Sequence, residues 1–315
     1  MANQPIFLEP VFQERIWGGK QLREQFHYDI PSDRTGECWA VSAHPNGQSV
    51  VHNGPYKGLK LGELWEQQPQ LFGSTAVKFP LLTKILDASD DLSVQVHPDD
   101  AYAQVNENGE LGKTECWYIL GCEPGAEIIY GHSAATKEQF KQMVDAGEWN
   151  QLLTKVTVKP GDFFYVPSGT LHALGKGIQV LETQQSSDTT YRIYDYDRTD
   201  DKGATRELHL DKGIEVTTVP HVDAETSFST ETVGGTEVTT FVSNSFFTVQ
   251  KWNTGGESAF PEPVKFTICS VLDGAGELEN ATGSYPLKKG DHFIIPLGFG
   301  SFTLRGQLEL IISHE

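Results

Sequence analysis

The sequence predicts a mainly β protein built as two β-barrels with a few short helices. Short apolar and aromatic runs, such as residues 77–88, 116–121 and 292–298, are ended by glycine, proline, asparagine or aspartate, as is typical of strands. A hairpin sequence occurs twice, at residues 159–172 and 288–301, which indicates that one β unit is built twice. The 315 residues are also long enough for two domains of about 150 residues each.

Three segments carry helix signals, at residues 61–72, 98–106 and 136–146. The middle segment follows a predicted strand directly. Pro98 has the fixed φ favoured at the first helical position, and Asp99 and Asp100 suit the positive end of the helix dipole. His97 is therefore expected where a strand passes into a helix.

The repeated hairpin aligns without gaps, and its turn residues recur in register. In the first copy, GDFFYVPSGTLH, glycine and aspartate open a tight turn, an apolar strand follows, and a second turn presents His172. In the second copy Ser301 stands where the first has His172. Counting back six residues from the strand-ending glycine gives Glu115 in the first copy and Ile268 in the second. We therefore expect a metal site in the first barrel and none in the second.

These patterns divide the chain into an N-terminal catalytic domain at residues 1–215 and a degenerate, metal-free domain at residues 237–315. The segment between them, residues 216–236, is polar, contains glycine and lacks apolar periodicity, so we expect a linker there.

Four residues of the first domain form a candidate metal site: Gln95, His97, Glu115 and His172. Gln95 and His97 are two apart on a predicted strand and share a face, which makes that face a barrel lumen. Glu115 enters an apolar strand, where a carboxylate needs a metal or charge partner. Two imidazoles, a carboxylate and an amide oxygen suit zinc.

Each of these residues has an ordinary explanation when it is taken alone. A single histidine such as His97 is commonly hydrogen-bonded in a core or exposed, and Glu115 alone would be a solvated carboxylate at a strand edge. Their combination with the complete hairpin favours a metal site. Gln95 is the weakest member, because neutral amides are poor zinc ligands and its side chain can instead hydrogen-bond substrate or water.

Basic residues near these segments suit a phosphorylated substrate, although each alone could be a solvated cation. Lys84 lies on the strand before Gln95, and Lys113 stands two residues before Glu115. Arg192 and Arg198 follow His172 along the chain. Arg192 is flanked by Tyr191 and Ile193 in a predicted strand. An arginine half buried in a strand usually faces an anion, so Arg192 is the strongest candidate among these four for an anion contact.

Composition excludes several classes of partner and location. The formal net charge of −19 opposes binding to nucleic acid or anionic lipid. No apolar run approaches the ~20 residues that span a bilayer, and the N-terminus lacks the pattern of a secretory signal. Four cysteines without a CxxC pair indicate reduced thiols in a cytoplasm. The sequence leaves the oligomeric state open.

With these residues in view, the chain resembles the type I mannose-6-phosphate isomerases, or phosphomannose isomerases, of the cupin superfamily, in their short bacterial form. The resemblance runs nearly end to end and rests on PVFQERIWGG, GECWAVSAHPNG, FPLLTKILDA, SVQVHP, GKTE, VPSGTLHALG and ETQQSSDTTYRIYDYDR, in that order. It implies two cupin-type, jelly-roll barrels. It also implies interconversion of mannose 6-phosphate and fructose 6-phosphate through an enediol.

The resemblance further implies roles for individual residues. Gln95, His97, Glu115 and His172 would bind one Zn²⁺ per chain. Arg192, Lys113 and Glu182 would be catalytic, and Ser93, Lys84 and Arg198 would contact the substrate. Lys113, Glu182 and a zinc-bound water all remain open as the proton carrier, and the residues that hold the phosphate also remain open.

Two other functions are compatible with the sequence. Two histidines and a glutamate also describe the iron site of a cupin dioxygenase, although the cationic residues argue against it. A sugar-binding cupin without catalytic activity is the other, since neither the repeat nor the acidity excludes it.

Overall fold

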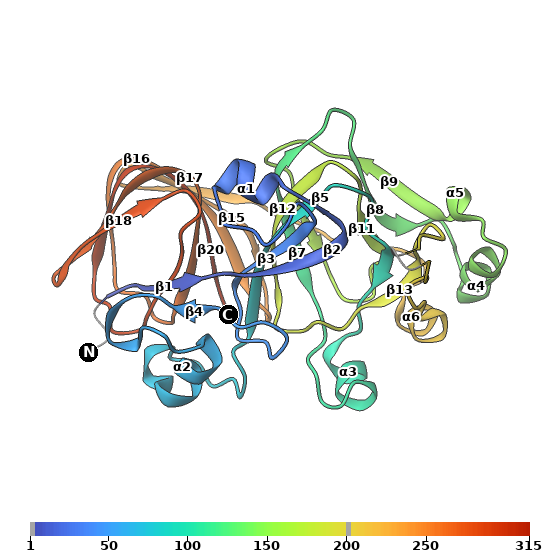
Figure 1. Ribbon diagram of the computed structural model, residues 1–315, viewed down its shortest axis with the longest axis horizontal. Helices are drawn as coiled ribbons and strands as arrows, with labels where there is room; N and C mark the ends of the chain where they lie inside the picture. Colours follow the sequence, from blue (N-terminus) through green and yellow to red (C-terminus); the bar gives the residue numbers. More distant parts are fainter. Residues whose placement is uncertain (1–3, 200–202) are drawn as a thin grey trace.

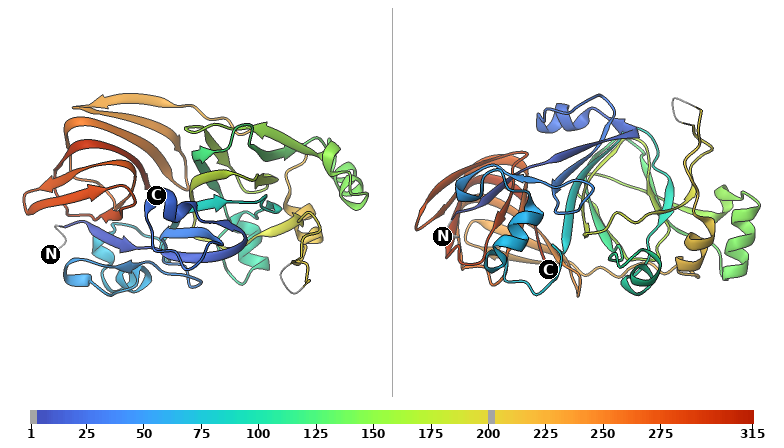
Figure 2. Two further views of the ribbon diagram at one scale, coloured as in Figure 1. Left: turned by 45° about the horizontal axis from the view of Figure 1, so that its top comes forward. Right: turned by 60° about the horizontal axis from the view of Figure 1, so that its bottom comes forward.

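The computed structural model describes residues 4–199 and 203–315, which form two β lobes side by side along the long axis of the molecule (Figure 1). The predicted mainly β fold is confirmed, and the helices are short and peripheral (Figure 2). Within the described ranges no helix is both long enough and apolar enough to cross a bilayer.

The first lobe consists of two sheets that face each other as in a jelly roll. In the described residues one sheet has six strands, in the order β10-β7-β12-β5-β3-β2, and the other has five, in the order β13-β6-β11-β8-β9. Trp117 from the first sheet and Ile128 from the second pack in one core between them. The strands of the six-stranded sheet are β2 (Val11–Gly19), β3 (Thr35–Val41), β5 (Leu81–Ala88), β7 (Glu115–Cys122), β10 (Phe163–Val166) and β12 (Ile178–Gln185). Those of the five-stranded sheet are β6 (Val94–Val96), β8 (Glu127–His132), β9 (Leu153–Thr157), β11 (His172–Leu174) and β13 (Tyr191–Tyr194).

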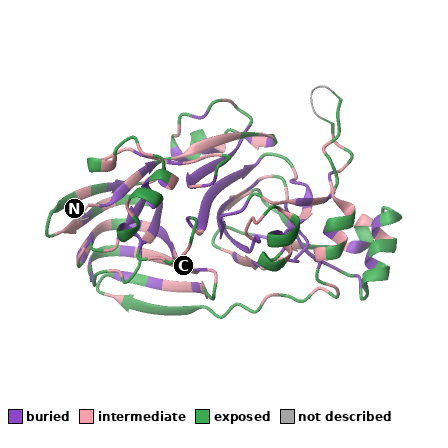
Figure 3. Ribbon diagram, turned by 90° about the horizontal axis from the view of Figure 1, so that it is seen from below, coloured by how far each residue is buried: buried purple, intermediate pink, exposed green. Residues whose placement is uncertain are grey.

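The two sheets meet face to face without closing into a barrel, because no pairing among the described strands joins one to the other. Every residue of β3 and β5 is buried, as the purple strands between the lobes show (Figure 3). Burial on both faces explains why these strands are rich in apolar residues, and it makes Glu37 and Lys84 buried charged exceptions.

The second lobe is a nine-stranded sheet within the described chain, with the path β14-β15-β16-β20-β17-β19-β1-β4 and with β18 paired to β17. An apolar core that includes Phe293, Leu304 and Leu310 fills it. Its strands are β1 (Ile6–Glu9), β4 (Val50–Val51), β14 (Ser229–Val233), β15 (Thr236–Ser243), β16 (Thr248–Phe260), β17 (Thr267–Asn280), β18 (Gly283–Lys288), β19 (His292–Ile295) and β20 (Phe302–His314).

Two pairings qualify the expected division of the chain. Strand β1 lies far before residue 215 but pairs with β19 of the second lobe, through Ile6 opposite Ile294. Strand β14 lies inside the expected linker and pairs with β15. The second lobe therefore takes strands from the beginning of the chain and from the segment at 216–236, so the domain limits stay a prediction.

The predicted helices form at the expected places with different ends. Helix α2 (Leu61–Gln67) stops before Pro69, and a 3₁₀ turn η2 (Pro69–Leu71) completes the segment. Helix α3 (Asp100–Asn106) starts two residues after Pro98, because the Asp99 side chain accepts the Tyr102 N–H as an N-cap. Helix α4 (Lys137–Asp145) is capped in the same way by Thr136. The elements that the sequence patterns missed are α1 (Gln21–Phe26), η1 (Gly54–Tyr56), α5 (Trp149–Leu152) and α6 (Leu210–Val216).

The two hairpin copies have the same backbone geometry. Gly161 and Gly290 have φ of 91° and 90°, a left-handed conformation that favours glycine. In each turn the aspartate that follows the glycine accepts a backbone N–H at 2.9 Å, from Lys159 in the first copy and from Lys288 in the second. The predicted repeat is therefore confirmed at the level of the turn.

Strand register corrects one residue of the comparison between the copies. Glu115 lies opposite Val166 in the first hairpin, and Thr267 lies opposite Ile295 in the second. The residue equivalent to Glu115 is therefore Thr267, and Ile268 is wrong. The error arose because Gly274 follows Thr267 by seven residues, whereas Gly121 follows Glu115 by six. Threonine offers no carboxylate, so the second copy still lacks this ligand.

Candidate metal centre and active site

Three strand ends bring the candidate ligands together. His172 begins β11 and pairs across the sheet with Gln95 of β6, while Glu115 begins β7 in the facing sheet. His97 follows β6 directly, and its carbonyl accepts the Gly169 N–H of the hairpin turn at 2.8 Å. The turn that presents His172 is thus tied to His97.

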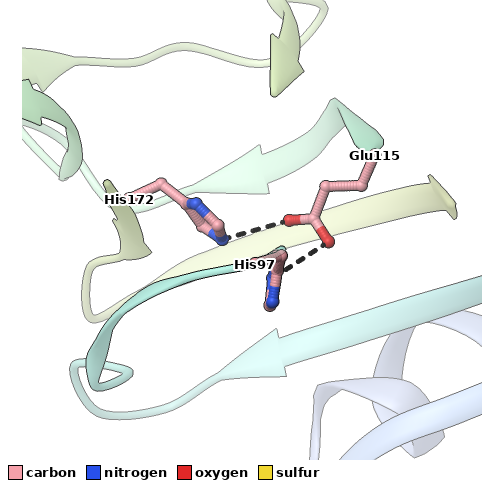
Figure 4. Close-up of side chains that lie close together, drawn as sticks. All are labelled: His97, Glu115 and His172. Atoms are coloured by element: carbon pink, nitrogen blue, oxygen red, sulfur yellow. Dashed lines mark ion pairs between the residues drawn. The ribbon is translucent and has the colours of Figure 1, made fainter. Parts of the chain in front are cut away.

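The two histidines and the glutamate point toward one another (Figure 4). His97 Nε2 lies 3.5 Å from Glu115 Oε2, and His172 Nε2 lies 3.3 Å from Glu115 Oε1. One potential ligand atom from each of the three residues lies within 4.8 Å of the other two. The side chain of Gln95 also reaches the cluster, with Nε2 3.4 Å from His172 Nε2. All four candidate ligands are therefore brought together.

Both imidazoles direct Nε2 at the centre of the cluster. His97 Nδ1 donates to the Thr189 carbonyl at 2.9 Å, and His172 Nδ1 donates to the Thr170 carbonyl at 2.8 Å. A carbonyl only accepts, so the ring proton is on Nδ1 and the lone pair of a neutral ring is on Nε2. Burial lowers the pKa of His97 well below its usual range and lowers the pKa of His172 to about 4.

The carboxylate of Glu115 shows what this centre requires. It is fully buried, and neither of its oxygens accepts a hydrogen bond of good geometry from the described residues. The ammonium of Lys113 forms an ion pair with it, with 2.7 Å between Nζ and Oε2. A buried carboxylate whose oxygens lack a hydrogen bond of good geometry, beside two imidazole lone pairs, fits a divalent cation that takes nitrogen and oxygen ligands.

A cavity of about 410 Å³ opens beside these residues. Lys84 lies on its wall between two buried carboxylates, with Nζ 3.8 Å from Glu37 Oε2 and 3.6 Å from Glu182 Oε1. Trp117 Nε1 donates to Glu182 Oε2 at 2.9 Å. Burial and the charge of Glu115 raise the pKa of the Glu182 carboxyl. The wall therefore carries a fixed cation next to a carboxyl that is easier to protonate than usual.

Five of the six predicted substrate-binding and catalytic residues line this cavity, together with the candidate ligand Gln95: Ser93, Lys84, Lys113, Glu182 and Arg192. Arg192 Nε donates to Ser93 Oγ at 3.2 Å, which orients the guanidinium. Arg198 does not line the cavity. Its guanidinium pairs with Asp195, with 2.7 Å between Nη2 and Oδ1. This position outside the cavity does not favour direct contact with a ligand bound there.

Four charged residues that line the cavity were not singled out from the sequence: Arg15, Glu37, Asp188 and Arg206. Arg15 and Glu37 form an ion pair at 2.7 Å and lie on neighbouring strands. Both belong to motifs quoted above. The available signal was Glu37, a charged residue directly before the apolar segment CWAV. For Arg206, which lies beyond the motifs, the sequence offered no comparable signal.

Comparisons with known proteins agree with this geometry. A family model described as phosphomannose isomerase type I, catalytic domain, matches residues 6–120, and one described as mannose-6-phosphate isomerase, cupin domain, matches residues 237–315. Mannose-6-phosphate isomerase ManA of Bacillus subtilis is 56% identical over 315 residues, covering 100% of both chains. The chain belongs to the type I phosphomannose isomerase family.

Other family members support the same assignment. Mannose-6-phosphate isomerase of Streptococcus mutans is 54% identical over 313 residues, covering 99% of this chain and 98% of its own. The crystal structure of mannose 6-phosphate isomerase from Bacillus subtilis superposes with a TM-score of 0.97 at 56% identity, covering 99% of each chain. The fold of the type I phosphomannose isomerases therefore extends over the whole described chain.

Proposed function

We propose that this protein is a mannose-6-phosphate isomerase, which interconverts D-mannose 6-phosphate and D-fructose 6-phosphate. The observation that carries the proposal is a cavity in which a set of metal ligands adjoins cationic side chains, in a chain that belongs to the type I phosphomannose isomerase family. The reaction moves hydrogen between C1 and C2 through an enediol and needs no external oxidant or reductant. The site accordingly has to bind a phosphorylated sugar and move protons.

We propose one Zn²⁺ per chain, held by His97, Glu115 and His172, with Gln95 as a fourth ligand. A rotation about the last side-chain bond of Gln95 would exchange its amide nitrogen for the oxygen that a metal prefers. When bound, zinc supplies Lewis acidity that polarises the sugar carbonyl without redox chemistry. Metal analysis of the purified protein tests the identity and the stoichiometry.

Glu182 is the residue best placed to carry the proton. Its carboxylate lies on the cavity wall, and burial moves its pKa toward neutrality, which suits a general base. It would take the proton from C2 of the aldose and return it to C1 of the enediol, while a second proton passes from O2 to O1. Lys113 is already engaged by Glu115 and would serve as a cation beside the sugar oxygens.

The remaining cavity residues bind and orient the substrate. Lys84 is fixed between Glu37 and Glu182, and its ammonium faces the cavity beside the proton carrier. Arg192, oriented by Ser93, presents a guanidinium that stabilises the negative charge of the enediolate.

The four cysteines are free thiols, which supports a cytoplasmic location.

A coupled assay for fructose 6-phosphate tests the proposed function. Mannose 6-phosphate should be converted by the purified protein, turnover should be lost on chelation, and zinc should restore it. Absence of turnover in protein shown by metal analysis to contain zinc would rule the isomerase out.

A further inference from the structure

Two arginines, Arg198 and Arg206, share one carboxylate at the edge of the cavity, and a third, Arg192, lies near them. Asp195 is buried, and its Oδ1 lies 2.7 Å from Arg198 Nη2 and 2.5 Å from Arg206 Nη2. Arg206 Nε donates to the second oxygen, Oδ2, at 2.8 Å. Arg192 is close enough that the charge of Arg206 adds to the effect of burial in lowering the pKa of Arg192.

The three guanidinium groups are opposed by one buried carboxylate, Asp195, in a protein whose formal net charge is −19. Asp90, which pairs with Arg198 at 3.6 Å, and Glu207, whose charge acts on Arg192, are largely exposed, so solvent screens their charges. Cations gathered at a partly desolvated place repel one another unless an anion joins them. Arg192 and Arg206 both line the cavity, so the surplus positive charge faces the space where the substrate would bind.

Asp195 also fixes which edge of Arg206 is available. The Nε and Nη2 groups of Arg206 are both directed at the carboxylate, a bidentate contact of the fork type. Within the described residues, Arg206 Nη1 has no hydrogen-bond acceptor. Arg198 holds Asp195 from outside the cavity and is itself anchored through the Asp91 carbonyl.

The cluster lies at some distance from the metal ligands. His172, Gln95 and Arg192 are directly opposite one another on three adjacent strands. With strands spaced about 4.8 Å apart, Arg192 stands roughly 10 Å from His172. A hexose 6-phosphate carries its carbonyl carbon and its phosphate at opposite ends. Because Arg192 lies beside the candidate ligand Gln95 on the neighbouring strand and is assigned to the enediolate, Arg206 is the guanidinium available for the phosphate.

We propose that Arg206 binds the phosphate of the sugar substrate, that Asp195 is the positioning residue that orients Arg206, and that Arg198 braces Asp195 from outside. This proposal rests on the isomerase function proposed above. It gives Arg198, which lies outside the cavity, an indirect role through Asp195. It also separates phosphate binding by Arg206 from the stabilisation of the enediolate by Arg192.

Steady-state kinetics with mannose 6-phosphate test the proposal. Arg206→Gln should raise KM about tenfold or more, as for loss of a contact between charged groups, and should leave kcat within about twofold. Asp195→Asn should raise KM in the same direction by a smaller factor, and the double variant should be less than additive. Arg206→Lys keeps the charge and should be intermediate. Arg23→Gln, which removes an exposed arginine paired with Asp33, is the matched control.

Binding of inorganic phosphate, measured by calorimetry on the metal-containing protein, separates this proposal from the isomerase function. Weaker phosphate binding in Arg206→Gln and Asp195→Asn supports the anion site even if no isomerisation is observed. Unchanged phosphate affinity in a folded Arg206→Gln protein, or a loss confined to kcat, would overturn the proposal. If Arg206→Gln does not fold, the same two measurements on Arg206→Lys decide.

Discussion

The two hairpins of this protein share a backbone and differ in what they present. Both open with a left-handed glycine followed by an aspartate that caps the turn, and both continue into a four-residue strand, β10 or β19. The first ends at His172, which is buried among the other candidate ligands, and the second ends at Ser301, which is exposed. Turn residues thus preserve the fold in both lobes, whereas the chemistry depends on a few side chains that only one lobe retains.

The interiors of the two lobes differ in the same sense. Charged groups such as Glu115, Lys113 and Glu182 are buried in the first lobe, where each has to be compensated by a partner. The corresponding space in the second lobe is filled by apolar side chains, among them Phe293 and Leu310. The first interior is therefore organised for binding and the second for stability.

The largest expected difference between the lobes is in metal content. His172→Ala should abolish metal binding because it removes one of three clustered ligands, and turnover should disappear with it. Ser301→Ala, at the equivalent position, should leave the metal content unchanged. Elemental analysis of both purified variants measures this, and equal loss of metal in the two would contradict the division of roles.

A smaller effect, on turnover and not on metal content, is expected from replacing Arg192, which lines the cavity of the first lobe. Arg192→Ala should retain the metal but lose about 100-fold or more in kcat, because a donor to the developing oxyanion is removed. The control is Arg305→Ala in the second lobe, where the guanidinium pairs with Glu257 and Glu279 at the surface. Full turnover in Arg192→Ala would remove this arginine from the mechanism.

The smallest effect concerns stability in the second hairpin, where His292 stands in place of Phe163. Its ring is buried between Tyr28 and Ser270, and burial lowers its pKa to about 3. Because the unfolded chain binds this proton near pH 6.5, the folded state should lose stability as the pH falls from about 6.5 toward 3. The slope from one such group is at most about 1.4 kcal/mol per pH unit.

Replacing this histidine with its first-lobe counterpart tests the effect. His292→Phe should reduce the pH dependence of the unfolding free energy, measured by urea denaturation at pH 7, 6 and 5, although the loss of two hydrogen bonds lowers stability overall. His314→Gln, near the end of the chain, is the control. The idea fails if His292→Phe and the unaltered protein show the same slope.

The sequence was sufficient for the fold class and the repeated hairpin, and it named four candidate ligands whose side chains the structure brings together. These features depend on local signals: glycine and aspartate in turns, alternation in β6, and a carboxylate inside an apolar strand. The predicted alternation in β6 is confirmed: Val94 and Val96 pack in one apolar core with Phe140 of α4 and Leu152 of α5, on the face opposite to Gln95.

Other features could not be read from the sequence because they depend on long-range pairing. Nothing local to Ile6 indicates that it lies beside Ile294. Nothing in the sequence indicates that Arg206 contacts Asp195, so the position of Arg198 relative to the cavity could not be deduced either. The one-residue error at Thr267 arose because a glycine was used as a marker in place of strand register.

The pairing of β1 with β19 has a consequence for synthesis and folding. Ile6 pairs with Ile294, so the second lobe cannot complete its sheet until the chain has been synthesised as far as β19. Closing so long a loop is an entropic cost that slows folding. The first lobe thus lies, along the sequence, between β1 and the later strands of the second lobe, and the pairing of β1 with β19 forms only after the first lobe has been synthesised.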